Sequence, residues 1–111
     1  MSEDQARRVG LNESIFRQVN EQIERLNRNL GADDAAMTVI CECADGDCTD
    51  RFQFQVADYE EVRADPLRYV VVPGHELSEY ESVVESRDGY DIVRKREGTA
   101  AALAEETDPR S

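Results

Sequence analysis

The sequence predicts an α+β domain: an N-terminal amphipathic helix packed on a small, mostly antiparallel sheet of about four strands, with one short helix between the second and third strands. Three observations predict it. Apolar residues recur every three or four positions early in the chain, two pairs of strand-like segments each enclose a turn signal, and one short segment is apolar on both faces. A chain of 111 residues can bury one modest core, so we expect one domain.

The first expected element is a helix from Asn12 to Leu30, which Asn12 or Ser14 can cap and Gly31 can end. Its apolar face consists of Phe16, Val19, Ile23, Leu26 and Leu30. The same residues form a heptad pattern over about two and a half repeats, fewer than the three or four that identify a coiled coil. We therefore favour docking of this face onto the rest of the domain, and keep a dimer built from two such helices as the alternative.

A β-hairpin is expected next, from MTVICEC at 37–43 and RFQFQV at 51–56, with the turn signal Asp45-Gly46 between them. Alternation along the first strand puts Cys41 and Cys43 on the same face as Met37. The segment DYEEVRAD then reads as a short helix with an Asp58 capping box.

The remaining strands follow from YVVV at 69–72, which is apolar on both faces as in a central strand, and from ESVVES and YDIVRK around Arg87-Asp88-Gly89. The domain so defined covers residues 11–97. Residues 1–10 read as a mobile leader and residues 98–111 as a flexible acidic tail, because both carry too little apolar surface to order themselves.

The charge balance excludes some partners. The chain has 25 acidic and 13 basic residues and a net charge of -12, which repels a phosphate backbone and argues against nucleic acid. A basic protein remains a candidate partner, and the chain is expected to be a monomer or a homodimer. With no apolar run long enough for a signal or a membrane span, we expect a cytoplasmic protein whose cysteines stay reduced.

The chemistry of the sequence concentrates in CECADGDC at 41–48 and PGHE at 73–76. Thiolate sulfur and imidazole nitrogen are the ligands zinc prefers, and three cysteines with one histidine form a common closed set. The candidate metal ligands are Cys41, Cys43, Cys48 and His75, with zinc as the expected metal.

The C-x-C spacing is the weak point of this hypothesis. Two residues on the same face of a regular strand lie about 6.6 Å apart, whereas sulfurs on one tetrahedral zinc lie about 3.8 Å apart, so a bulge or a bent strand end is required. Without a metal, Cys41 and Cys43 would be small buried hydrophobes and His75 a loop residue bonded to the backbone. A thiol-based redox role is disfavoured because Asp45, Asp47 and Asp50 raise the pKa of nearby thiols.

A catalytic zinc site would need an open position and a general base, for which Glu76 beside His75 is the candidate. Four available protein ligands favour a closed site instead. A calcium loop is rejected because DGDCTD lacks the order of an EF-hand and Val56 occupies the place of its closing glutamate.

With CECADGDC, YEEVRADP, VVVPGHE and ETDPR in view, the chain resembles a group of short uncharacterised bacterial proteins, from about Phe16 to Arg110. The resemblance implies a self-contained protein with a C-x-C-x4-C cluster and a PGHE loop, and brings no activity with it. The favoured function is a small cytoplasmic zinc-binding adaptor or regulatory protein with a structural metal. The alternatives are a zinc-dependent hydrolase or lyase using Glu76, and a metal-free interaction module that dimerises through the N-terminal helix.

Overall fold

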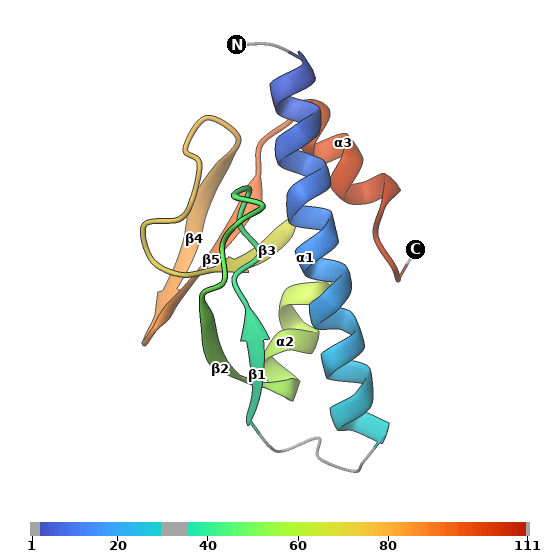
Figure 1. Ribbon diagram of the computed structural model, residues 1–111, viewed down its shortest axis with the longest axis vertical. Helices are drawn as coiled ribbons and strands as arrows, with labels where there is room; N and C mark the ends of the chain where they lie inside the picture. The colour runs from blue at the N-terminus through green and yellow to red at the C-terminus, as the bar shows by residue number, and fades with distance from the viewer. Residues whose placement is uncertain (1–2, 30–35, 111) are drawn as a thin grey trace.

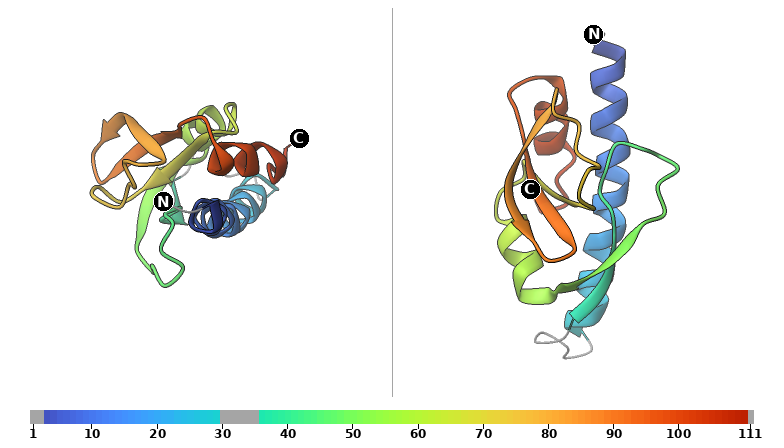
Figure 2. Two further views of the ribbon diagram at one scale, coloured as in Figure 1. Left: turned by 90° about the horizontal axis from the view of Figure 1, so that it is seen from above. Right: turned by 90° about the vertical axis from the view of Figure 1, so that its left-hand side faces the viewer.

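The computed structural model describes residues 3–29 and 36–110, and over these residues the fold is α+β (Figure 1). The elements in chain order are α1 (Glu3–Asn29), β1 (Ala36–Ile40), β2 (Arg51–Gln55), α2 (Val56–Arg63), β3 (Arg68–Val71), β4 (Glu81–Arg87), β5 (Tyr90–Lys95) and α3 (Thr99–Glu106). The strands form two antiparallel sheets, β1-β2 and β3-β5-β4. Figures 1 and 2 show α3 beside the N-terminal half of α1. The described part of the chain contains no helix with the length and apolar character needed to cross a membrane.

Both expected hairpins are confirmed. In the first, Met37 pairs with Phe54 and Val39 with Phe52. The second turns at Gly89, whose φ of 91° is a conformation that favours glycine. Alternation in the first pair and the tight-turn signal in the second are local patterns, so no distant contact was needed to predict either hairpin.

The core lies between the sheets and α2. Phe54 meets Tyr59 edge to face at 5.9 Å between ring centroids and lies 4.4 Å from the ring of Tyr90. Tyr59 and Val62, three residues apart on one face of α2, point inward, and both are buried. The Asp58 capping box is wrong: α2 already begins at Val56, and Asp58 instead pairs with Arg87 at 3.4 Å.

The run at 69–72 is not a central strand. β3 is an edge of its sheet and β5 lies in the centre. Val70 is nevertheless fully buried, because the segment after β1 covers the free edge of β3: the Glu42 N–H donates to the Val70 carbonyl at 2.8 Å, and the Val70 N–H donates to Glu42 Oε1 at 3.1 Å. An apolar strand can therefore sit at an edge when a loop protects its hydrogen-bonding groups.

The first helix differs most from expectation. It begins at Glu3, so residues 3–10 of the expected mobile leader are helical, and Ala6 and Val9 in that stretch are buried. Gly10 allows α3 to approach closely, because a Cβ at this position would lie 3.0 Å from Leu103 Cδ1. The docking of α3 therefore orders the start of α1.

The buried face of α1 is largely polar. Its fully buried members include Glu13, Arg17 and Asn20, each with distant partners. Arg17 donates to the carbonyls of Pro66 and Ala104, and Asn20 bonds both the N–H and the carbonyl of Ile40. These bonds satisfy backbone groups at the ends of other elements, which is why a polar face can be buried.

The expected apolar face of this helix does not dock as a unit. Ile23 packs against the core and Phe16 is half-buried, but Val19 and Leu26 are 39% and 63% exposed. Leu30 lies outside the described residues. Docking of the N-terminal helix onto the sheet is confirmed, but the face that docks is a different one.

The expected flexible tail is also ordered where it is described. Thr99–Glu106 form α3, and Leu103 and Ala104 are buried. Beyond it, Arg110 donates to Glu21 at 2.8 and 2.9 Å and to Glu24 at 2.9 Å, and it also pairs with Glu60. Leu103 and Arg110 together anchor this segment.

Replacing Arg110 should test this anchor. Arg110→Ala leaves the buried carboxylates of Glu21 and Glu24 with fewer partners, so we expect the free energy of unfolding to fall by about 1–3 kcal/mol. Urea unfolding gives the value, with Arg51→Ala at an exposed position of β2 as the control. Equal effects of the two substitutions would show that the contacts of Arg110 add nothing to stability.

Candidate metal centre

Three of the four candidate ligands come from the loop between β1 and β2. Because β1 ends at Ile40, Cys41 and Cys43 lie beyond the strand, and both are buried together with the Glu42 between them. The loop is closed by two backbone hydrogen bonds, from Cys41 N–H to the Asp50 carbonyl at 2.9 Å and from Cys48 N–H to the Asp45 carbonyl at 3.0 Å. The expected strand to residue 43 is thus too long, and its early end removes the spacing objection to C-x-C ligation.

The fourth ligand follows β3. His75 lies in a turn closed by its own N–H, which donates to the Val72 carbonyl at 3.0 Å. The Val72 N–H donates in turn to Cys41 Sγ at 3.2 Å. The edge of β3 that pairs with Glu42 therefore also places the histidine turn against the cysteine loop.

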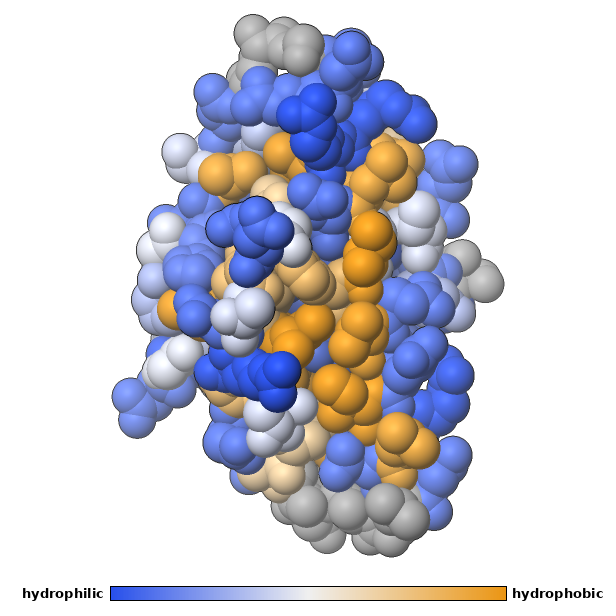
Figure 3. Space-filling view, viewed as in Figure 1, coloured by the Kyte–Doolittle hydropathy of each residue, from blue (hydrophilic) through white to orange (hydrophobic). Residues whose placement is uncertain are grey.

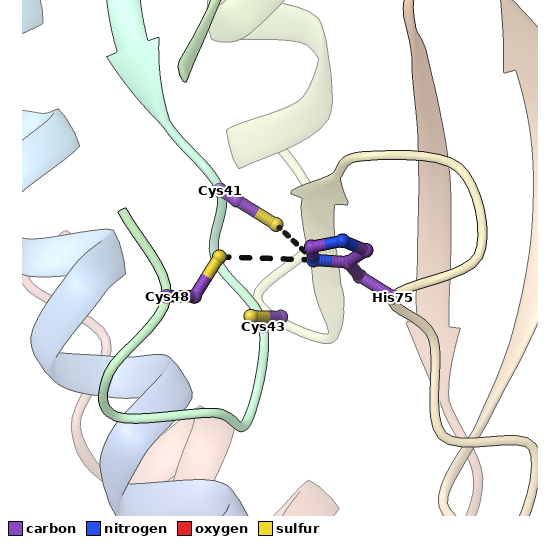
Figure 4. Close-up of side chains that lie close together, drawn as sticks. All are labelled: Cys41, Cys43, Cys48 and His75. Atoms are coloured by element: carbon purple, nitrogen blue, oxygen red, sulfur yellow. Dashed lines mark hydrogen bonds between the residues drawn. The ribbon is translucent and has the colours of Figure 1, made fainter. Parts of the chain in front are cut away.

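The four side chains converge (Figure 4). Their ligand atoms all lie within 4.8 Å of one another. His75 Nδ1 lies 3.5 Å from Cys41 Sγ and 3.7 Å from Cys48 Sγ. In a tetrahedral zinc site, bond lengths of about 2.3 Å to sulfur and 2.0–2.1 Å to nitrogen separate S and N by about 3.6 Å and two sulfurs by about 3.8 Å. The cluster therefore fits one ion after a contraction of about 1 Å at most.

The other nitrogen of the imidazole also has a partner. His75 Nε2 lies 3.3 Å from Asp50 Oδ2. A carboxylate on the second ring nitrogen is the usual arrangement at metal-binding histidines, because it fixes the tautomer that leaves the first nitrogen free to coordinate. A carboxylate at this place favours the tautomer with its proton on Nε2, which leaves the lone pair of Nδ1 toward the sulfurs.

The thiols differ in acidity. A hydrogen bond from Cys41 lowers the pKa of the Cys43 thiol to about 5, whereas the same contact, together with burial, raises the pKa of Cys41. Burial also raises the pKa of Cys48. The expectation that the neighbouring aspartates raise the pKa of the nearby thiols is wrong for Cys43, whose pKa is lowered.

The chain was compared with protein-family models, curated proteins and solved structures. None of them matches it. The interpretation of the site therefore rests on its own geometry.

An open cavity of about 450 Å³ adjoins the cluster, between α1 and the two loops, and His75 and Cys43 lie in its wall. Asn12 of α1 borders the same space and donates to the Ala44 carbonyl at 2.8 Å, which holds the cysteine loop to the helix. The proposed general base, Glu76, accepts a hydrogen bond from the Gly74 N–H at 3.2 Å.

All four sequence-predicted ligands are brought together, but sequence reasoning missed two supporting residues. Glu42 fixes the loop to β3, and Asp50 contacts the histidine. The sequence shows Asp50 two residues after Cys48, but its partner His75 is 25 positions further on, so only the fold shows their contact.

Asp50 should affect metal affinity without being a ligand. Asp50→Asn keeps the shape but removes the carboxylate on His75 Nε2, so we expect the affinity for zinc to fall about 10–100-fold with the stoichiometry unchanged. Competition with a chromophoric chelator measures this. Asp47→Asn, on the same exposed loop, is the matched control and should bind as tightly as the wild type. Equal affinities for all three proteins would contradict a supporting role for Asp50.

Proposed function

We propose that this protein is a small cytoplasmic zinc-binding adaptor or regulatory protein, in which Cys41, Cys43, Cys48 and His75 hold one structural zinc ion. The observation that carries the proposal is the convergence of all four ligand atoms within 4.8 Å, with His75 Nδ1 at 3.5 and 3.7 Å from two sulfurs. Soft thiolates with one imidazole favour zinc over the hard cations that prefer oxygen.

The closed ligand set favours a structural role over a catalytic one. Four protein side chains fill a tetrahedral shell and leave no position for a water molecule. Cys41 and Cys43 are 1% and 2% exposed, whereas Cys48 and His75 are partly exposed. Within the described ranges 3–29 and 36–110, His75 and the three cysteines are the only group of potential ligands close enough together to hold a metal ion.

The mechanical effect of the ion would be to join two loops. The loop at 41–50 and the turn at His75 are otherwise connected by a few hydrogen bonds along β3. Because the two segments follow strands of different sheets, the ion would fasten the β1-β2 sheet to the β3-β5-β4 sheet. A partner that binds this end of the molecule would then meet a surface whose shape depends on the metal.

Cobalt substitution tests the proposal. Bound to three thiolates and one imidazole in a tetrahedral shell, Co²⁺ gives sulfur-to-metal charge-transfer bands and intense visible d–d bands, and zinc should displace it stoichiometrically. Cys48→Ser should change both sets of bands, whereas Ser82→Ala on β4, away from the site, should leave them intact. Weak octahedral spectra in the wild type would contradict the proposed centre. Tetrahedral spectra with an exchangeable water would favour the hydrolase or lyase alternative.

A further inference from the structure

The outer face of α1 carries a row of exposed apolar side chains, which we call the outer stripe: Leu11, Ile15, Val19 and Leu26. Their exposed fractions are 41%, 61%, 39% and 63%. Spacings of four, four and seven keep these residues on one side of a helix. Figure 3 shows apolar side chains in a column along the front of the molecule, over α1. Soluble monomers rarely expose a continuous apolar surface of this kind.

The stripe is unusual because an ordinary surface helix buries its apolar face and exposes its polar one, whereas α1 does largely the opposite. Its polar residues Glu13, Arg17 and Asn20 are fully buried, while the four aliphatic residues of the outer stripe face outward. Burial of a charged face in place of the available apolar one gains nothing from the hydrophobic effect. The outer face of α1 is therefore suited to contact with another molecule.

A groove accompanies the stripe. A cavity of about 340 Å³ is lined by Leu11, Ser14, Ile15, Gln18 and Val19 of α1 together with Thr107 after α3. The first four residues have the spacing i, i+3, i+4, i+7, which is the hole that receives one side chain of a partner helix in knobs-into-holes packing. Leu26, the most exposed large apolar residue of the described chain, is a side chain of the right kind to fill it.

We propose that the outer stripe is the interface between two copies of this chain, whose α1 helices pair antiparallel across a two-fold axis. Leu26 of each copy then enters the groove of the other, so knob and hole are each used twice, as an isologous interface requires. Leu11 and Leu26 are 15 residues apart, which spans about 22 Å of helix. Because a leucine lies at each end of that span, the stripe presents the same kind of side chain at both ends when a second α1 lies against it in the antiparallel direction.

The charges around the stripe favour a second copy in this orientation. Between Leu11 and Leu26 every acidic residue of α1 is buried on the opposite side, so two chains with a net charge of -12 can approach here without bringing carboxylates together. The exposed charged residues within one turn of the stripe on this side of α1 are Arg7, Arg8 and Arg25. A parallel pair would set each arginine beside its own copy and bring like charges together, whereas an antiparallel pair keeps the two copies of each arginine apart.

The proposed interface does not depend on zinc, and it goes beyond the metal-binding role. It shares Val19 and Leu26 with the helix face expected from the sequence, but replaces Phe16 and Ile23, which are partly buried in this fold, with Leu11 and Ile15. A monomer that binds zinc would contradict the interface alone. A dimer that binds no metal would contradict the metal centre alone.

The oligomeric state tests the interface. We expect sedimentation equilibrium of the wild-type chain to give a mass of twice 12.6 kDa, and Ile15→Glu to give the monomer mass with an unchanged circular dichroism spectrum. Val84→Glu is the matched control, because Val84 is 46% exposed on β4 and should leave the dimer intact. A monomeric wild type would overturn the proposal and leave the stripe to a different protein. A dimer that Val84→Glu breaks and Ile15→Glu does not would place the interface on the sheet and overturn it as well.

A charge pair tests the orientation. Leu11→Glu alone and Leu26→Arg alone should each weaken the dimer, because each buries an unpaired charge. With both changes in one chain, antiparallel pairing sets the introduced carboxylate of one copy beside the introduced guanidinium of the other, and the dimer should return in large part. A parallel pair would set like charges together. Failure of the double variant to recover while both singles are folded would overturn the antiparallel arrangement.

Discussion

Removal of the metal is expected to destabilise the protein strongly. Zinc held by three thiolates and an imidazole contributes about 10–16 kcal/mol in peptides that fold only with the metal. Here the aromatic core around Phe54 and Tyr59 does not depend on the ion, so the effect on unfolding should be smaller. We expect a strong chelator to lower the free energy of unfolding by about 3–5 kcal/mol, which corresponds to a fall in Tm of roughly 15–25 °C for a domain of this size.

The location of the change is as informative as its size. Hydrogen exchange should rise in the loop at 41–50 and around His75, which the proposed ion would join, before it rises in β5. His75→Ala is the control, because a protein that cannot hold the metal should melt at the same temperature with and without chelator. A wild type whose Tm does not respond to the chelator would show that the cysteines are core residues and that the metal is not structural.

Replacement of Lys95 should be the most damaging change away from the metal centre. Lys95 is the only lysine of the chain, its side chain is fully buried, and it pairs with the equally buried carboxylates of Glu13 and Glu81. Its ammonium group also lies 5.3 Å from the centre of the Tyr69 ring. Lys95→Met keeps the length but leaves two buried carboxylates without their cation, so we expect a loss of about 3–5 kcal/mol of unfolding free energy.

The effect of Lys95→Met should depend on pH in a defined direction. Burial already raises the pKa of Glu13 well above its usual value, and the lysine opposes that rise. A carboxyl whose pKa is raised by folding binds its proton more tightly in the folded state, so stability is present at low pH and is lost as pH rises through the folded pKa. Without Lys95 this loss should steepen. The variant should therefore approach the wild type in acid and differ from it most at neutral pH.

Two further variants separate this explanation from simple loss of packing. Arg96→Met, at the exposed neighbouring position, should have little effect. Glu13→Gln and Glu81→Gln, added to Lys95→Met, should restore part of the lost stability because they remove the uncompensated charges. Urea unfolding across the pH range gives the free energy of unfolding of Lys95→Met, of Arg96→Met and of the triple variant. No recovery in the triple variant would contradict the electrostatic account.

The parts of the fold that the sequence predicted correctly depend on local patterns. The first hairpin has alternating apolar residues, the second has the Asp88-Gly89 turn, and α2 has Tyr59 and Val62 at helical spacing. The metal ligands were identifiable for a related reason, since Cys41, Cys43, Cys48 and His75 are the only thiols and imidazole in the chain. No contact had to be known to single them out.

Two of the larger errors share a physical cause, because each involves polar groups whose partners are far away in the sequence. Polar contacts, and not apolar residues, determine which face of α1 is buried. Asn20 binds the end of β1, Arg17 binds α3, and Glu13 pairs with Lys95. Arg110 orders the last described residues through carboxylates on α1 that lie some 90 positions earlier. Hydrophobic periodicity contains no information on such pairs, so it assigned the apolar face of α1 to the core.

The metal content of the purified protein tests the central claim most directly. Untagged protein, prepared under reducing conditions, should contain about one zinc per chain by elemental analysis, as a closed set of four ligands requires. His75→Ala and Cys43→Ser should lose most of that zinc, while Val84→Glu should retain it. A folded wild-type protein without metal, which also takes up none when zinc is added, would contradict the account.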